Sequence, residues 1–276
     1  MIDTWSILRC PTCGRPPGPK AEACAGCGRA VRAAGGAYDL LTDAERDAAD
    51  AFAAAYSRLR RNEGWASRDG LEGPGHGSDR LWKPRREAAR QAAHWVAGGI
   101  VLDVGSGGGW LPDLLPGAEV VAVDLLEPPM ASAAGLRVRG DMRRLPVADG
   151  AVDACVYCAS LHHAPVARAI EEAARVLRPG GLLLVLESPF HKDAAAAAAA
   201  QRRSRAYYRK AGAGELADAY HPIAQDVLES ALASAGLTVE LLEQPQPWRL
   251  PGRLPRFPLL VARRTGGDDR GQEDDQ

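Results

Sequence analysis

Three glycines at alternating positions, Gly105, Gly107 and Gly109, follow an apolar run that carries Asp103. Glycine has no Cβ and accepts a positive φ, so a chain rich in it can turn sharply and approach a ligand closely. A buried strand that ends in such a turn is the usual frame of a nucleotide-cofactor site. The dinucleotide pattern G-x-G-x-x-G is not met, because Trp110 stands where its third glycine would fall. A phosphate loop of the G-x-x-x-x-G-K-[ST] type does not occur either. The cofactor therefore need not carry a pyrophosphate.

The glycine loop and four later segments resemble, in the same order, the motifs of class I S-adenosylmethionine (SAM) methyltransferases. The later segments are residues 120–124, 140–146, 151–157 and 175–181. A single glycine loop is a weak signal, but five ordered motifs in a strand–turn–helix context are specific. From about Lys83 to Arg264 the resemblance implies an α/β, Rossmann-like fold. It implies a seven-stranded, mostly parallel sheet with one antiparallel strand and helices on both faces.

The resemblance also implies SAM as the cofactor and suggests which residues hold it. Asp124 stands at the end of the second strand, where the family holds the ribose hydroxyls. Asp141 stands where an acid meets the adenine amino group. The predicted cofactor-binding residues are Asp103, Gly105, Ser106, Gly107, Gly109, Asp124, Leu125, Asp141, Met142 and Ala159. One departure from the family is the segment 110–116, whose prolines leave room for barely two helical turns.

Two C-x-x-C pairs near the N-terminus, each followed by glycine, have the spacing of a metal site. Their cysteines are Cys10, Cys13, Cys24 and Cys27. Two thiolates can grip a metal from each tight turn, and four complete a tetrahedron with no position left for catalysis. Residues 1–41 therefore look like a small zinc ribbon, which has little apolar core and depends on the metal to fold. Because the main domain has its own core, we expect metal loss to affect mainly this segment.

The alternatives for the four cysteines are a disulfide or a redox pair. No apolar run is long enough to cross a membrane, and no signal-peptide pattern opens the chain, so we expect a cytoplasmic location. Stable disulfides are rare there, and no βαβ pattern surrounds the cysteines to suggest a thioredoxin-like site. A third pair, Cys155 and Cys158, falls in a predicted strand, where positions three apart face opposite sides. We expect two buried thiols at that pair.

Histidines near the predicted crevice are the candidates for a general base. His162 and His163 directly follow the fourth predicted strand, and His191 follows the fifth. In the methyl transfer that the resemblance implies, the leaving group is already activated, so the protein mainly positions two reactants. A base helps only a nucleophile that arrives protonated. We predict His162, His163 and His191 as catalytic, ahead of His221, with a purely structural role as the alternative.

Two helices are predicted ahead of the glycine loop. Thr42 and Glu45 form a capping box, which predicts a helix over residues 42–61, followed by a flexible linker to residue 82. Pro84 suits the first turn of a second helix, over residues 83–96, because its missing N–H is not needed at that position.

An insertion at residues 187–221 contains a run of seven alanines, which predicts a helix over 193–211. Insertions at this point commonly cover the pocket in the family, so we expect a lid over the acceptor; a helix with a solvated charged face is the alternative. The remaining predictions are a helix over 222–235, strands over 237–242 and 255–263, and a disordered acidic tail over 265–276.

Three functions are compatible with these motifs. The net charge of −1, from 34 basic and 35 acidic residues, argues against extensive nucleic-acid binding. We therefore expect a small-molecule acceptor and no membrane partner. The alternative is an RNA methyltransferase. A zinc ribbon ahead of this domain resembles the ribosomal RNA guanine-N1 methyltransferases, although that family's ribbon includes a histidine ligand. An inactive SAM-binding scaffold is disfavoured by the intact glycines and acids. The sequence does not indicate an oligomeric state.

Overall fold

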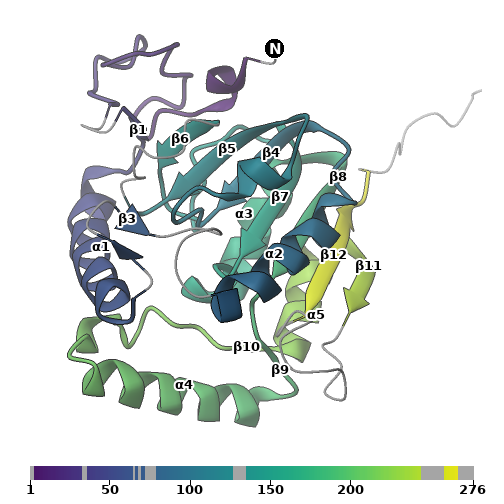
Figure 1. Cartoon of the computed structure of the whole chain (residues 1–276). Helices are drawn as coiled ribbons and strands as arrows, with labels where there is room; N and C mark the ends of the chain where they lie inside the picture. The colour runs from purple at the N-terminus through teal and green to yellow at the C-terminus, as the bar shows by residue number, and fades with distance from the viewer. Residues whose placement is uncertain are drawn as a thin grey trace, which may run out of the picture.

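The computed structural model describes residues 3–32, 36–64, 66–67, 70–71, 79–126, 135–243 and 258–266. Its centre is an eight-stranded sheet with the order β1-β6-β5-β4-β7-β8-β12-β11 (Figure 1). The strands, in that order, are Tyr38–Asp39, Leu136–Arg139, Ala118–Asp124, Gly99–Val104, Val152–Cys158, Leu177–Leu186, Leu259–Arg264 and Leu237–Glu243. Only β12 runs antiparallel to its two neighbours, β8 and β11. The predicted fold is therefore confirmed.

The sheet has one strand more than the sequence predicts, because β1 extends its edge. Tyr38 pairs with Val138 and Asp39 with Arg139, in parallel register. The sequence places both Tyr38 and Asp39 in the predicted zinc ribbon, residues 1–41, and not in the main sheet. A two-residue strand whose partner lies far along the chain has no local periodicity, so the sequence pattern does not reveal it. As a result, the cysteine segment (residues 3–41) is joined to the main sheet.

Helices cover both faces of the sheet, as predicted (Figure 1). Helix α2 (Asp79–Ala93) packs on one face through three buried alanines. Helices α3 (Val166–Val176) and α5 (Gln225–Ser234) pack on the other face. The strands alternate between these layers: Cys155 packs with the α3 side, whereas Cys158 packs with the α2 side. The thiols of the third C-x-x-C pair thus face opposite sides of the sheet, as expected.

Helix α1 (Asp43–Asn62) begins at the predicted capping box. The N–H of Glu45 donates to Thr42 Oγ1 at 3.3 Å, and the N–H of Thr42 donates to Glu45 Oε2 at 2.7 Å. The prediction for α2 is wrong at its start, because the helix begins at Asp79 and Pro84 lies inside it. Buried Trp82 packs edge to face on Trp110 at 6.1 Å, a tertiary contact that favours helix before the proline.

The remaining elements surround the carboxyl ends of the strands. Helix α4 (Ala194–Lys210) is capped by Asp193, whose Oδ1 accepts the N–H of Ala196 at 2.7 Å. Helix α5 starts later than predicted, because Ile223 and Ala224 form β10 and pair with β9 (Phe190–His191). The short elements are η1 Thr4–Ile7, β2 Ala66–Ser67, β3 Gly70–Leu71, η2 Leu111–Leu114, η3 Leu161–His163 and η4 Gly214–Leu216. Where the prolines leave room for barely two helical turns, the structure has only η2, a 3-10 helix of four residues.

Some predictions fall outside the described residues. These are residues 65, 68–69 and 72–78 of the flexible linker, the first residues of the last predicted strand, and nearly all of the acidic tail. In the described part of the linker β2 pairs with β3, and residues 79–82 belong to α2. No helix in the described part of the chain combines the length and the apolar character needed to cross a membrane.

Candidate functional site

Two adjoining pockets among the described residues open at the carboxyl ends of β4, β5 and β7. The first, of about 320 Å³, is the histidine pocket, which contains His162. The second, of about 300 Å³, is the Asp124 pocket. Both are lined by Tyr56, Gly105, Gly107, Ala159 and His163. The strand order reverses between β4 and β7, and this is where open α/β sheets bind their ligands.

The glycine loop needs glycine for two separate reasons. Gly105, Gly107 and Gly109 all have positive φ, at 73°, 53° and 66°. A Cβ on Gly105 would also lie 2.4 Å from the Cβ of Ser160, a distance at which one of the two must move. Gly105 and Gly107 line the pockets, whereas Gly109 is not among the described lining residues. Gly109 instead closes the loop, because its N–H donates to the Ser106 oxygen at 2.9 Å.

Asp124 ties the glycine loop to the end of β5. Its Oδ2 accepts the N–H of Gly107 at 2.7 Å and its Oδ1 accepts the N–H of Leu126 at 2.8 Å. Burial raises the pKa of Asp124, and these hydrogen bonds oppose the shift because they stabilise the charged form. Each carboxylate oxygen keeps a further lone pair. The side chain can therefore hold the loop and still accept hydrogen bonds from ligand hydroxyls.

Three further predicted cofactor-binding residues line the Asp124 pocket. They are Leu125, Asp141 and Met142. Asp141 is buried and paired with Arg143, whose Nε lies 2.9 Å from Asp141 Oδ2 and whose backbone N–H donates to Oδ1 at 2.7 Å. The acid is therefore neutralised by Arg143, a neighbour that the sequence analysis did not assign to the site.

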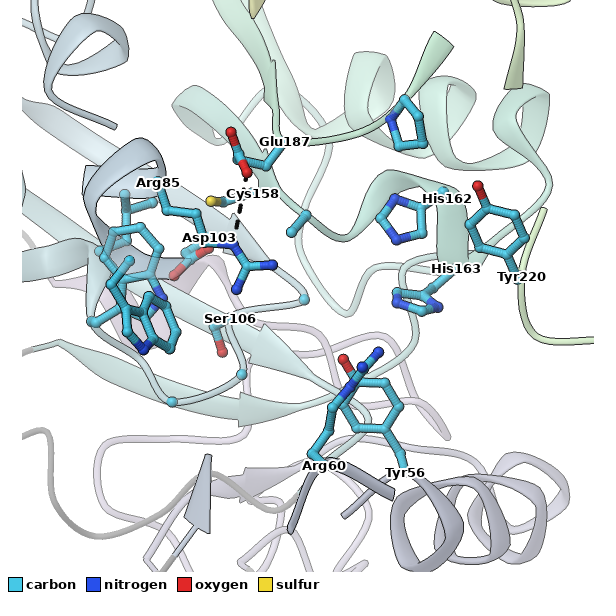
Figure 2. A pocket seen from close by; sticks show the side chains of 18 residues that line it. Tyr56, Arg60, Arg85, Asp103, Ser106, Cys158, His162, His163, Glu187 and Tyr220 are labelled. Carbon is cyan, nitrogen blue, oxygen red and sulfur yellow. Dashed lines mark ion pairs between the residues drawn. The ribbon is translucent and has the colours of Figure 1, made fainter. Parts of the chain in front are cut away.

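Asp103 and Ser106 line the histidine pocket, and each offers a polar group that a ligand can bind (Figure 2). Asp103 is 2 % exposed, and its burial, together with the charge of Asp124, raises the pKa of Asp103 to about 7. A cationic group bound beside it would favour the charged form. Ser106 Oγ is buried and has no hydrogen-bond partner among the described residues. A buried hydroxyl without a partner at a pocket wall indicates a place for a polar ligand group.

His162 and His163 lie together on one side of the histidine pocket, opposite Asp103 (Figure 2). The centroids of their rings are 4.5 Å apart. The Nδ1 of His163 is 3.1 Å from the oxygen of Ala219, and the Nδ1 of His162 is 3.2 Å from Ser188 Oγ. Burial lowers both pKa values, that of His163 to about 4. Both rings are therefore neutral near pH 7, the state in which an imidazole can accept a proton.

The other two candidate histidines occupy different places. His221 lines the Asp124 pocket, and its N–H donates to the His162 oxygen at 2.7 Å. His191 lies in β9 and is not among the described residues that line either pocket. Helix α4, which we expected to cover the acceptor, also contributes no residue to the described lining of either pocket. The insertion reaches the histidine pocket through residues at its two ends, Glu187 and Tyr220.

Helix α1 supplies the pocket wall that the sequence analysis missed. Phe52 and Tyr56 line the Asp124 pocket, and Tyr56 and Arg60 line the histidine pocket. The guanidinium of Arg60 lies over the Tyr56 ring at 4.5 Å and pairs with Glu63 at 2.6 Å. Phe52 and Tyr56 stand four residues apart in the sequence, which is a helical spacing. That spacing indicates a buried face but not whether protein or ligand covers it.

An unusual backbone conformation is shared by two residues of the histidine pocket. Ala159 and Glu187 follow β7 and β8, and each has a φ of 57° although neither is glycine. Such conformations are uncommon for residues with a Cβ and cluster at functional sites. The carboxylate of buried Glu187 lies 3.8 Å from the Nε of Arg85 on α2. Ala159 is one of the predicted cofactor-binding residues, whereas no sequence pattern indicates its left-handed backbone or assigns Glu187 to the site.

The four N-terminal cysteines converge on one point. Their sulfur atoms all lie within 4.8 Å of one another, with Cys10 and Cys27 at 3.7 Å and Cys13 and Cys24 at 3.6 Å. Zinc–sulfur bonds of ~2.3 Å in a tetrahedron separate the sulfurs by roughly 3.8 Å. The six cysteines, all within the described residues, are free thiols. The arrangement therefore fits a tetrahedral metal and excludes disulfides in this structure.

The two cysteine turns have matching geometry. Gly14 and Gly28, which follow the second cysteine of each pair, have φ values of 69° and 74°. Their N–H groups donate to the oxygens of Cys10 and Cys24 at 2.9 and 2.8 Å. Burial alone would raise the pKa of Cys10, but backbone hydrogen bonds from the same turn lower it to about 7. Thiolates are the metal-binding form, so the hydrogen bonds of the first turn favour metal binding at Cys10.

Comparison with known proteins agrees with this geometry. Residues 102–185 match a family model described as a methyltransferase domain. The demethylmenaquinone methyltransferase of Thermus thermophilus is 39% identical over 127 residues, which cover 41% of this chain and 56% of that protein. The chain thus spans about half the length of the curated relatives that it matches.

Solved structures share the fold at low sequence identity. The 1,6-didemethyltoxoflavin N1-methyltransferase of Burkholderia thailandensis, solved with that compound and S-adenosylhomocysteine, has a TM-score of 0.53 at 18% identity. That match covers 82% of this chain and 92% of the other. A geranyl diphosphate methyltransferase has a TM-score of 0.54 at 16% identity, covering 79% and 99%. With the ordered strands and glycine loop, these matches show the Rossmann-like class I methyltransferase fold, and the family model shows that residues 102–185 are similar to a methyltransferase domain.

Proposed function

We propose that this protein transfers a methyl group from SAM to a small-molecule acceptor. The main support for the proposal is that the two pockets adjoin: Gly105, Ala159 and His163 line both of them. One pocket has carboxylates for a nucleoside, and the other has two neutral histidines for a reacting group. When bound, SAM supplies a methyl group on an already activated sulfonium, so the protein's task is mainly to position two reactants.

The residues fit the cofactor in chemical character. Asp124 accepts hydrogen bonds from ribose hydroxyls, while Asp141 and Met142 take the adenine end. Asp103 suits the ammonium group of the methionine part, and Ser106 has an unused buried hydroxyl for its polar atoms. The glycine loop lets the backbone come close to the ligand.

The histidines suit an acceptor that must lose a proton. A carbonyl oxygen only accepts, so the contact with Ala219 makes the Nδ1 of His163 the protonated nitrogen and leaves a lone pair on Nε2. Either ring can accept a hydrogen bond from an acceptor hydroxyl or amine, and its lowered pKa makes it a weaker base than a free imidazole. Aromatic side chains surround this space, among them Trp82, Trp110 and Tyr220. They support a planar acceptor, and a demethylmenaquinol analogue is the first compound to test, given the Thermus relative.

RNA is the less favoured acceptor. A basic groove does lie between the cysteine segment and the main domain, with Arg9, Arg144 and Arg175 along it. However, Arg144 is paired with Glu45, and Arg175 with Glu172 and Asp149. Arginines neutralised in this way have less charge to offer phosphates, and the chain has a net charge of −1.

The proposal is tested by methyl transfer from labelled SAM to two panels, one of quinols and other planar small molecules and one of bulk ribosomal and transfer RNA. We expect label in the small-molecule panel, and loss of it in a His162→Gln variant. Transfer to RNA instead, with binding that weakens steeply as salt rises, would reverse the acceptor class.

We further propose that the four cysteines hold one structural zinc ion. Elemental analysis of protein purified without chelator should give one zinc per chain, lost in Cys24→Ser. A zinc-free protein that is fully folded would refute this assignment.

A further inference from the structure

We propose that the cysteine centre controls ligand binding in the Asp124 pocket, by holding the N-terminal end of helix α1 in place. The inference rests on the proposed SAM site and the proposed zinc, and it concerns how the two communicate. Four sets of contacts link them, from the cysteine turns to the pocket wall.

The first link is the attachment of the cysteine segment to the main domain. Leu8 pairs with Val147 as an antiparallel bridge. The N–H of Arg9 donates to the Pro146 oxygen, and the N–H of Ala148 donates to the Ile7 oxygen, both at 2.9 Å. Leu8 is fully buried, and Cys10 belongs to the same hydrophobic cluster as the sheet. Metal loss should therefore reach beyond this segment, contrary to our expectation from the sequence.

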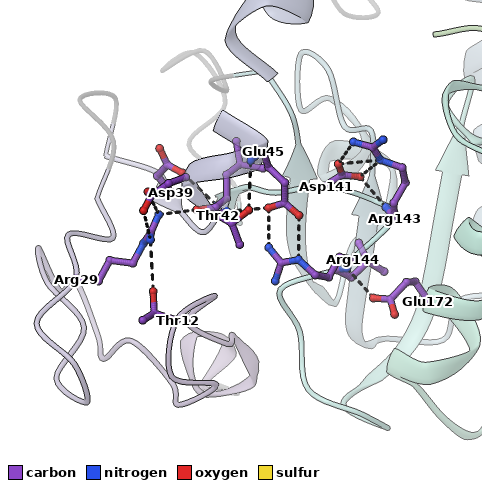
Figure 3. A network of polar contacts seen from close by, with 12 residues as sticks. Thr12, Arg29, Asp39, Thr42, Glu45, Asp141, Arg143, Arg144 and Glu172 are labelled. Atoms are coloured by element: carbon purple, nitrogen blue, oxygen red, sulfur yellow. Dashed lines mark hydrogen bonds and ion pairs between the residues drawn. The ribbon is translucent and has the colours of Figure 1, made fainter. Parts of the chain in front are cut away.

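The second link joins the second cysteine turn to α1. The N–H of Cys24 donates to the backbone oxygen of Arg29 at 2.8 Å, so this turn places Arg29. The Arg29 guanidinium then donates to the Leu41 oxygen and to Asp43 Oδ1, both at 2.8 Å. Asp43 is exposed and contributes little by itself, whereas the bond to the carbonyl is partly buried. Arg29 thus ties the turn to the first residues of the helix (Figure 3).

The third link is Glu45, which belongs both to the helix cap and to the pocket. Its carboxylate closes the capping box with Thr42 and accepts two bonds from Arg144, at 2.9 and 2.6 Å. A bidentate arginine–carboxylate pair fixes orientation as well as distance. Glu45 also lines the Asp124 pocket. The first turn of α1 is therefore held between the cysteine segment and the loop that follows Asp141 (Figure 3).

The fourth link is α1 itself, which forms one wall of the Asp124 pocket. Ala49, Phe52 and Tyr56 line the pocket at successive turns of this helix. Arg143, next to Arg144, pairs with Asp141 on the facing side. A change in the position of the first helical turn therefore changes the distance between the two sides of the pocket. Without metal, Arg29 loses its fixed place, and we expect this turn to fray and ligand affinity to fall.

The test measures S-adenosylhomocysteine binding by calorimetry in zinc-loaded protein and in protein treated with chelator. We expect roughly tenfold weaker binding without zinc, the effect of losing about one charge-assisted hydrogen bond. Hydrogen exchange should rise in the first turn of α1 and stay unchanged in β7. Re-addition of zinc should restore both.

A pair of variants tests the route without touching a metal ligand. Arg29→Gln should keep one zinc per chain and yet bind S-adenosylhomocysteine several-fold more weakly. Arg32→Gln is the matched control. Arg32 is as buried as Arg29, with 17% side-chain exposure, but it contacts Glu22, Gly36 and Tyr38, all within the cysteine segment. We expect the affinity of Arg32→Gln for S-adenosylhomocysteine to stay within twofold of that of the parent.

The outcomes separate this inference from the proposed function. Equal affinity with and without zinc, or an Arg29→Gln variant that binds like the parent, overturns the coupling and leaves the SAM site standing. Failure of the zinc-loaded parent to bind S-adenosylhomocysteine overturns both. If the chelated protein unfolds, which circular dichroism will show, the Arg29→Gln and Arg32→Gln comparison decides alone.

Discussion

His163 Nδ1 lies 3.1 Å from the carbonyl oxygen of Ala219, and this contact determines which ring nitrogen carries the proton. The carbonyl comes from the end of the insertion, whereas the ring follows β7. The contact thus couples the loop beyond α4 to the pocket floor and directs an unprotonated Nε2 away from the carbonyl.

Acid should destabilise the protein through His163. Burial lowers the pKa of His163 to about 4, below its ordinary value near 6.5. Between these values the unfolded chain binds more protons than the folded one, so stability falls as pH drops from 6.5 towards 4. His163→Asn, which keeps a donor for Ala219, should reduce this loss. The loss of stability is measured as the difference between the melting temperatures at pH 7 and pH 5. His94→Asn, a change at an exposed histidine, is the control and should leave this difference as in the wild type. Equal acid sensitivity in both variants would contradict the prediction.

Gly105→Ala should abolish S-adenosylhomocysteine binding and destabilise the fold by about 2 kcal/mol or more, because a positive φ and a clash combine. Gly150→Ala is a matched control for φ alone. Gly150 has a φ of 61°, but the nearest atom to an added Cβ is 4.0 Å away. Thermal unfolding and calorimetry of both variants separate the two effects. A similar loss of thermal stability in the two variants would show that the contact between the added Cβ and Ser160 is unimportant.

Ligand affinity should depend on the charge of Asp103. Burial and Asp124 raise the pKa of Asp103 to about 7, and a bound ammonium group favours the ionised form. Below pH 7 the carboxyl must first lose its proton, so binding at pH 6 should be roughly tenfold weaker than at pH 8. Asp103→Asn should bind more weakly at pH 8 and show a flatter profile. A wild-type affinity that does not change between these pH values would rule out the ammonium contact.

Local patterns predicted the fold because each carries a short-range signal. The apolar run into Gly105 gave a strand and a loop, and Thr42 with Glu45 gave the start of α1. The four cysteines converge because two rigid turns leave them few alternatives. In each case the physical cause lies within a few neighbouring residues.

The rest depended on contacts between distant segments. The pairing of Tyr38 with Val138, the wall formed by Tyr56 and the proline inside α2 are all tertiary effects. The lid prediction assumed that α4 covers the pocket, yet α1 occupies the wall beside it. A helical pattern indicates a buried face but not its partner.

The most direct test of the account is calorimetric titration of S-adenosylmethionine into the wild type and Asp124→Ala. The carboxylate offers two charge-assisted hydrogen bonds to ribose hydroxyls, together worth ~3 kcal/mol. We therefore predict one site per chain and about a hundredfold weaker binding in Asp124→Ala. Asp226→Ala, an exposed change on α5, should bind like the wild type. Absence of binding in the wild type, or unchanged affinity in Asp124→Ala, would contradict the assignment of this pocket to SAM.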